Sequence, residues 1–525
     1  MLPRIGSAAP RGALGPVLPA SLLVVLVIAG CKVGPNFQPQ EAKMPGGWEG
    51  PTTVPASQPA SAPSAVDLAR WWKVFGDPTL SSLVERGVRS NLDLKSALAR
   101  VQQARAARGV AFSALWPTAD AVGAFTRRYP VAGPGGVSPG NSFQLGLDAA
   151  WEIDVFGGVQ RNVESADAAI QGAVEDSRGV QITLISEVAL NYANLRGFQQ
   201  RLAIARRNLG IQQNSAELTR KKKKAPGASG TTDLDVANAD AQVATTASLI
   251  PVLETAARQT IYTLSVLLGQ PPAALVEELS PAGPLPAGPP EVPLGLPSEL
   301  LRRRPDIRSA EAQIHAATAQ IGVATADLFP KFNLAGTFNY QSSKLEPLVN
   351  WASRNWAFGP SVDWQIFNAG KVLSNIEVQK ALQEQAVLNY AKTVLTALQD
   401  VENALVAYAN EFDHRKALAD AVTANRRAVE LATKQYGVGQ TEFINVLDAQ
   451  RSLFASEDAL SQSNTALATN LISLYKALGG GWDQEPPASA GGPRLTGVSA
   501  EMPASAPASM PASMPASMPA GPDMR

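Results

Sequence analysis

The most constraining feature of this 525-residue sequence is an internal repeat. The segments that recur 213 residues later are Gly109–Ala111 with Gly322–Ala324, Leu115–Pro117 with Leu328–Pro330, and Trp151–Ile153 with Trp364–Ile366. A fixed offset of this kind indicates two copies of one structural unit. We predict a first repeat over residues 67–270 and a second over 298–482. The proline-rich stretch 271–297 is the linker between them.

Each copy contains a pair of predicted strands. They span residues 118–129 and 142–153 in the first copy, and 331–340 and 355–366 in the second. From Phe143 to Ile153 apolar side chains occupy alternate positions, with small or polar residues between them. A period of two over about ten residues fits a half-buried soluble sheet and a transmembrane β-barrel strand equally well.

A long helical hairpin is predicted after each strand pair, over residues 158–268 and 370–478. In the second hairpin, apolar residues recur at spacings that alternate between four and three. They are Val387, Ala391, Val394, Leu398, Val401, Leu405, Tyr408 and Phe412. A first helix of about 65 residues would be roughly 100 Å long. Heptads alone are typical of soluble coiled coils. Their alternation with strand pairs, twice in one chain, points to a different architecture.

The N-terminus has the pattern of an export signal. Residues 1–30 combine Arg4 and Arg11 with an apolar stretch that is too short to span a bilayer. The small residues before Cys31 resemble the lipobox of bacterial lipoproteins, so we expect a covalent lipid on this cysteine. The alternative is an uncleaved membrane helix. Residues 31–66 then form a lipidated tether, and the Pro/Ala/Ser/Met-rich tail 483–525 is predicted to be disordered.

Composition excludes several function classes. The 45 basic residues balance the 45 acidic ones, so no net charge attracts a nucleic acid. One cysteine and two histidines make a metal site improbable, and no motif for nucleophilic, nucleotide-dependent or metal-dependent catalysis is present. We therefore predict a non-enzyme without catalytic residues, metal or cofactor, apart from the lipid on Cys31.

The number of strands constrains the assembly. One chain supplies four candidate membrane strands, whereas closed membrane barrels have at least eight. Open strand edges do not persist in lipid. Three chains would supply twelve strands and enclose a water-filled lumen. The predicted fold class is therefore mainly α with a membrane β-barrel part, built by a trimer that acts as a conduit.

Several motifs, in this order, resemble the outer membrane factors, the TolC-like efflux ducts, in their lipoprotein branch. They are Cys31–Phe37, Trp71–Leu80, Arg304–Ile307, Leu328–Pro330, Tyr436–Gly439, Val446–Leu453 and Leu474–Trp482. The resemblance implies a homotrimer with a 12-stranded β-barrel on a 12-helix α-barrel. It also implies a lipid-anchored location in the cell outer membrane, with the helices in the periplasm. The partners would be outer-membrane lipid, a periplasmic adaptor protein and an inner-membrane pump of the resistance-nodulation-division type.

The resemblance also implies which residues form the periplasmic gate. Asp448 matches the acidic position of the gate and Ile444 the apolar one, while Asn445 stands where some relatives have a second aspartate. Three symmetry-related Asp448 carboxylates around one axis would repel one another and favour cation binding. We expect this gate to be less acidic than that of relatives with two aspartates.

The hairpin tips are the expected docking site for the adaptor. Their predicted residues are Lys224, Gly227, Gly230 and Thr231 in the first hairpin, and Tyr436, Gly437, Gly439 and Thr441 in the second. The run Lys221–Lys224 replaces the usual Arg-aromatic-x-x-Gly of the family. It is either a solvated helix end, where cations suit the C-terminal dipole, or a recognition patch for an acidic adaptor tip.

The predicted function is that of the exit duct of a tripartite efflux system, which passively conducts drugs or other small molecules across the outer membrane. Two alternatives remain open at this stage. The duct could export metal ions or proteins, or the chain could be a periplasmic coiled-coil lipoprotein scaffold without a pore. The scaffold would explain the heptads and the anchor but not the duplicated strands.

Overall fold

The computed structural model describes most of the chain. The described residues are 32–40, 42, 44–49, 68–128, 140–224, 231–286 and 297–483. All of them belong to one compact unit, Met1–Asp483, and a second unit, Gln484–Arg525, lies outside the described residues. The predicted signal peptide, Cys31, Gly227, Gly230 and the tail from residue 484 also lie outside them.

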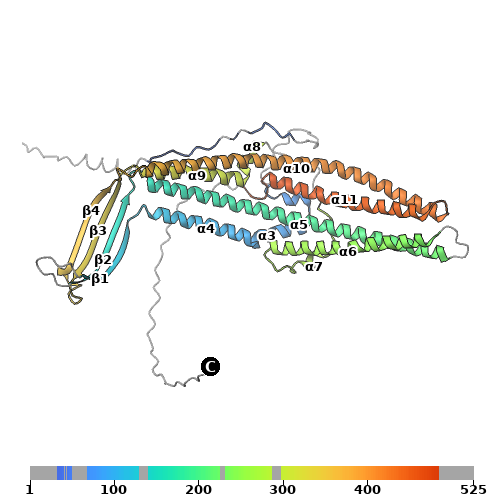
Figure 1. Ribbon diagram of the computed structural model, residues 1–525, viewed down its shortest axis with the longest axis horizontal. Helices are drawn as coiled ribbons and strands as arrows, with labels where there is room; N and C mark the ends of the chain where they lie inside the picture. Colours follow the sequence, from blue (N-terminus) through green and yellow to red (C-terminus); the bar gives the residue numbers. More distant parts are fainter. Residues whose placement is uncertain are drawn as a thin grey trace, which may run out of the picture. The chain divides into compact units, whose positions relative to one another are not determined.

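Both strand pairs join in one four-stranded antiparallel sheet (Figure 1). The strands are β1 (Thr118–Arg128), β2 (Gly140–Ile153), β3 (Lys331–Ser342) and β4 (Arg354–Asp363), in the order β1-β2-β3-β4. The central pairing, β2 with β3, runs from Phe143 opposite Ser342 to Ile153 opposite Phe332 and so unites the two copies of the repeat.

The strand ends differ from the predicted ones by at most two residues, except at the end of the fourth strand. The fourth strand was expected to reach residue 366, but β4 ends at Asp363. Beyond it, the Trp364 indole N–H donates to the Leu328 carbonyl (3.1 Å), and the Ile366 N–H donates back to the Trp364 carbonyl (3.0 Å). The strand ends there because its partner β3 begins at Lys331, opposite Asp363 and directly after Pro330.

The sheet has one apolar and one polar face. Cross-strand partners on the first face include Leu147 with Phe338, which in turn lies opposite Trp356. Asp148 lies opposite Thr337 on the second face. Large apolar side chains of the first face, such as Trp356 at 68% exposure, are uncovered within this chain. An uncovered apolar face opposite a polar one is typical of strands between lipid and a wet lumen.

Long helices make up the rest of the described unit (Figure 1). The six longest are α4 (Leu92–Ser113), α5 (Gly158–Lys224), α6 (Asp233–Leu267), α9 (Pro305–Ala326), α10 (Lys371–Gly437) and α11 (Phe443–Ala477). The shorter ones are η1 (Trp71–Phe75), α3 (Pro78–Ser90), α7 (Val276–Leu279), α8 (Pro297–Arg303) and η2 (Trp351–Ser353). Helices α5 and α10 have 67 residues each, so each rises about 100 Å. None of the described helices combines the length and hydropathy needed to cross a bilayer.

Antiparallel packing arranges these helices as two hairpins. Helix α6 folds back on α5, α11 folds back on α10, and α4 and α9 lie along the ends nearest the sheet (Figure 1). All four connections between strands and long helices fall at one end of the sheet, because each strand pair is entered from α4 or α9 and left into α5 or α10. The fold confirms the predicted mainly helical class with strand pairs between long helices.

The hydrophobic core lies where the shorter helices meet the hairpins. Trp71 stacks on Tyr475 at 5.3 Å between ring centroids, and burial raises the pKa of Tyr475 to about 12. Beside them the guanidinium of Arg304 donates to the Ala477 carbonyl (3.1 Å) and to the carboxylate of Asp400 (3.1 Å). Arg304 thereby ties the start of α9 to α10 and to the C-terminal end of α11.

Between this core and the hairpin tips, α5 and α11 meet through polar side chains. Glu457 is 9% exposed and accepts hydrogen bonds from Arg207 (2.9 Å), Asn208 (3.3 Å) and Arg426 (3.0 Å). Burial alone would raise the pKa of Glu457, but these three donors outweigh it and hold the pKa below the ordinary value. The carboxylate thus joins α5, α10 and α11 at one point.

We predict that Glu457→Gln lowers the thermal stability of the detergent-solubilised protein near neutral pH. Since both arginines are more than half exposed, the loss is about 1–2 kcal/mol. Because the pKa of Glu457 is lower in the folded state, its carboxylate contributes fully to the stability of the protein above the ordinary pKa of 4.5. This contribution disappears as the pH falls through the lowered pKa of the folded state. Apparent melting midpoints by circular dichroism should therefore differ at pH 7 and converge at low pH.

The matched control is Glu430→Gln, because Glu430 forms an exposed ion pair with Arg427 on α10. Its midpoint should stay within the error of wild type. An equal shift in both variants would contradict a specific role for Glu457.

Candidate functional site

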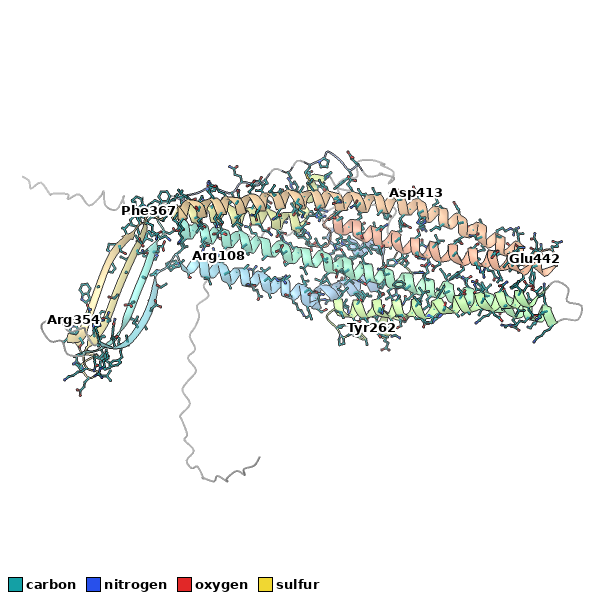
Figure 2. All side chains as sticks on the ribbon, in the orientation of Figure 1. Arg108, Tyr262, Arg354, Phe367, Asp413 and Glu442 are labelled. Carbon is teal, nitrogen blue, oxygen red and sulfur yellow. The ribbon has the colours of Figure 1, made fainter. Side chains whose placement is uncertain are left out.

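The turn ends of the two hairpins pack against each other, beside Glu442 in Figure 2. The buried residues of this tip cluster are Ala216 of α5, Ala239 of α6, Tyr436 of α10, and Phe443, Val446 and Leu447 of α11. The rings of Tyr436 and Phe443 lie 5.2 Å apart across the turn of the second hairpin. The tips therefore form a small apolar core of their own, separate from the central one.

The second tip is a tight turn that depends on glycine. Helix α10 ends at Gly437, and Gly439 has a positive φ of 77°, which glycine adopts without a Cβ penalty. The next N–H, of Gln440, reaches back to the Gln435 carbonyl at 2.9 Å. Gly437 and Gly439 are exposed, whereas Tyr436 is only 7% exposed and faces the tip cluster. The exposed surface of this turn therefore consists of residues 437–440, without the Tyr436 ring.

The three predicted gate residues share one exposed side of α11. Ile444, Asn445 and Asp448 are all exposed, and the opposite side of the same helix turns buries Phe443, Val446 and Leu447. The Asn445 amide donates to the Thr441 hydroxyl at 2.7 Å, which fixes its position at the start of the helix. The fold thus brings the predicted gate residues together on one free surface.

Arg451 connects this surface to the first hairpin. Its guanidinium donates to the side-chain oxygen of Gln242 on α6 at 2.6 Å and lies 3.6 Å from the Asp448 carboxylate. The amide of the preceding residue, Gln450, donates to the Ser215 hydroxyl of α5 at 3.0 Å. Helix α11 is therefore held to the first hairpin by polar contacts within three residues of Asp448.

Most of the lysine run is engaged within the chain. Lys222 donates to the Tyr436 carbonyl (3.0 Å), and its ammonium lies 4.0 Å from the centre of the Tyr436 ring. Lys221 pairs with Glu217 at 2.6 Å and Lys223 pairs with Asp233. The hydrogen bond and charge of Lys221 lower the pKa of Glu217. Lys224, the last residue of α5, is exposed.

A second site lies where the strands meet the helices. The N-terminal segment from Lys32 packs there: the Val33 N–H donates to the Phe156 carbonyl (3.2 Å), between β2 and α5. The guanidinium of Arg161, 1% exposed, donates to the carbonyls of Val33 (3.1 Å) and Gly34 (3.3 Å). It also donates to the side-chain oxygen of Asn36 at 2.8 Å. Cys31 itself lies outside the described residues, one residue before this bound segment.

Sequence reasoning missed three of these residues: Arg161, Lys222 and Arg451. Nothing in the pattern singles out Lys222 among four consecutive lysines, because its role depends on the tip of the other hairpin. Arg161 and Arg451 sit in helices among other basic residues and gain their roles from partners more than 100 residues away. Residues 31–66 were predicted to be a tether, whereas Val33, Gly34 and Asn36 are bound at this junction.

Charged side chains also line a cavity in the core. Within the described ranges, no group of three or more His, Cys, Asp or Glu side chains is placed to hold a metal ion. One cavity of about 510 Å³ is lined by the core residues Arg304, Asp306 and Asp400. These groups pair with one another and with a helix end, so they have a structural role.

Comparisons with known proteins agree with this geometry. Residues 83–270 and 296–480 match the family described as outer membrane efflux protein. Nodulation protein T of Rhizobium leguminosarum bv. trifolii is 33% identical over 472 residues, which cover 89% of this chain and 97% of that protein. The pyoverdine export outer membrane protein OpmQ of Pseudomonas aeruginosa is 33% identical over 455 residues, which cover 83% of this chain and 94% of that protein.

A solved structure, that of the outer-membrane channel OprN, is similar with a TM-score of 0.79 and 36% identity. The similarity covers 86% of this chain and all of that one. The family match extends over both repeats and includes the strands, the hairpins and the tips. The chain therefore belongs to the outer membrane efflux protein family, and it is an outer-membrane efflux channel rather than an enzyme.

Proposed function

We propose that the chain works as a homotrimer whose twelve strands close one barrel in the outer membrane and whose hairpins form a helical duct in the periplasm. The observation that carries this is the single four-stranded sheet with an uncovered apolar face. Its outer edges, on β1 and β4, have no strand partner among the described residues. Lipid offers no hydrogen bonds, so neighbouring copies must complete the ladder.

The channel receives its cargo from a periplasmic adaptor and an inner-membrane pump of the resistance-nodulation-division type. The exposed tip residues Lys224, Gly437 and Gly439, together with the half-buried Thr231 and Thr441, form the docking surface for the adaptor. The cargo consists of small organic molecules, as the pyoverdine export role in the name of OpmQ suggests. A scaffold without a pore would leave the four-stranded sheet without a function.

The N-terminus is anchored by a lipid on Cys31. Support comes from the bound segment that begins at Lys32, because Lys32 packs against Gly157 at the junction of sheet and helices. In a barrel of this orientation, that junction lies at the periplasmic surface of the outer membrane. Acyl chains on Cys31 would therefore enter the lipid directly beside the strands, with no free tether between them.

The gate consists of Ile444, Asn445 and Asp448 around the three-fold axis. Contacts of Lys222 with Tyr436 and of Arg451 with Gln242 hold the gate helix α11 to the first hairpin. Opening requires these contacts to loosen, since the tips must separate for the entrance to widen. Asp448 supplies the charge of the ring, and Arg451 lies close enough to orient it.

Asp448→Ala is expected to increase the conductance of single channels in a planar bilayer. Removal of three carboxylates from the axis also weakens block by Mg²⁺ about tenfold, equivalent to about 1.4 kcal/mol. Asp420→Ala on α10, an exposed aspartate away from the tip, is the charge-matched control. Unchanged block in Asp448→Ala would remove Asp448 from the gate, and the absence of channels in well-folded wild type would contradict the duct itself.

Lys222→Ala should raise the open fraction of the same channels by about threefold to tenfold. It removes one cation–π contact and one hydrogen bond between the tips, worth about 0.7–1.4 kcal/mol together. Lys224→Ala carries the same charge change without this contact and should gate like wild type. Equal gating of the two variants would show that Lys222 does not couple the hairpins.

Metabolic labelling with a palmitate analogue tests the anchor. Wild type should incorporate the label, and Cys31→Ser should not. Arg161→Ala should incorporate it normally but melt earlier, because four charge-assisted contacts of a buried guanidinium are lost, about 2–4 kcal/mol. Unlabelled wild type would refute lipidation, and an unchanged melting midpoint in Arg161→Ala would refute the role of the bound segment.

A further inference from the structure

Two arginines lie at the end of the sheet that points away from the helices, where Figure 2 labels Arg354. Arg127 is close to the end of β1, and Arg354 is the first residue of β4. Side chains alternate between faces along a strand. Arg127 therefore shares the apolar face with Phe125, two residues away, and Arg354 shares it with Trp356. Both arginines are exposed.

The surroundings of Arg354 leave most of its donors free to bind a ligand. Its guanidinium lies 4.3 Å from the ring centre of Trp351, and one Nη donates to the Trp351 carbonyl at 2.7 Å. Tyr340 lies directly opposite on β3, and Trp351 is 67% exposed. Exposed tryptophan and tyrosine are enriched where a membrane protein meets the polar headgroups. We expect Arg354 to lie at headgroup level, and its remaining N–H groups have no hydrogen-bond partner among the described residues.

The balance of charge at this end is positive. The described charged residues here are Arg127, Arg128, Lys344, Arg354 and Glu346. Lys344 and Glu346 belong to the connection between β3 and β4 and offset each other. Arg128 lies on the polar face, because it alternates with Arg127. The excess positive charge on the lipid-facing side is therefore that of Arg127 and Arg354.

The two arginines occupy opposite edges of the sheet, since β1 and β4 are its outermost strands. In the trimer of the proposed function, on which this step rests, β4 of one protomer lies beside β1 of the next. Arg354 of one copy and Arg127 of its neighbour then meet on the lipid-facing side of each junction. A guanidinium fork matches phosphate oxygens in a bidentate geometry.

We propose that Arg127 and Arg354 form a binding site, one at each junction between protomers, for the phosphate groups of a lipid in the outer leaflet. The apolar face below them, with Phe125 and Trp356, accommodates the acyl chains of the same lipid. A lipid bound across the junction covers both of its strands and holds neighbouring protomers together. The ligand is thus a phosphorylated lipid of the outer leaflet, and the site lies at each junction between protomers.

Native mass spectrometry of the detergent-purified trimer with added diphosphorylated lipid A tests the site. The variant Arg127→Gln/Arg354→Gln should retain lipid A about tenfold less well than wild type, because two charged donors are lost. Arg128→Gln removes a charge at the same end on the other face, and it should bind like wild type. Lipid A without phosphates should bind wild type as weakly as the double variant binds the intact lipid.

Each outcome separates this inference from the proposed function. Equal retention by wild type and the double variant, with both still trimeric, would overturn the lipid site and leave the channel intact. Equal binding of phosphate-free lipid A would overturn phosphate recognition in favour of acyl-chain contact. A monomeric wild-type protein in non-denaturing detergent would instead contradict the trimer. If the double variant fails to assemble, Arg354→Gln alone, with an expected intermediate loss, provides the same comparison.

Discussion

Backbone hydrogen bonding at the two edges of one sheet is the constraint on which the rest of this structure depends. Four strands from two sequence repeats pair internally, and β1 and β4 present unpaired edges within the described chain. In hydrocarbon, an unpaired N–H or C=O group costs several kcal/mol. Closure by further copies is the physical solution. Such a shared barrel accounts for the uncovered apolar face and for the polar face opposite it. It also accounts for the attachment of α4, α5, α9 and α10 at one end of the sheet.

The helical part combines a rigid region with an adjustable one. At mid-length of the helical part, Trp71, Tyr475 and Arg304 belong to a large core in which helix ends are capped and rings are stacked. Toward the tips, α5 and α11 meet through Glu457 and other polar side chains, and only a small apolar cluster closes the end. Polar contacts between helices exchange partners at lower cost than interdigitated apolar side chains. The stiff part therefore lies at mid-length of the helices, and the more adjustable part lies at the hairpin tips.

Much of the site followed from sequence, and the remainder depended on distant partners. The heptads and the absence of proline predicted α5 and α10, and the resemblance placed Ile444, Asn445 and Asp448 at one helix start. The lysine run left two interpretations open. In the folded chain Lys222 contacts Tyr436, while Lys221 and Lys223 pair locally, so three of the four lysines have partners within the chain. No local pattern distinguishes these lysines, because the partner of Lys222 lies 214 residues away.

The sequence by itself determined the duplication, the type and approximate length of each element, and the family, since periodicity and spacing depend on neighbours along the chain. The tertiary structure alone decided that the two strand pairs share one sheet and that β4 ends at Asp363 rather than at residue 366. It also decided that Arg161 binds the segment after Cys31, and that Arg127 and Arg354 occupy opposite edges of one apolar face. These features depend on register and on contacts between remote segments, which hydrophobic periodicity does not encode.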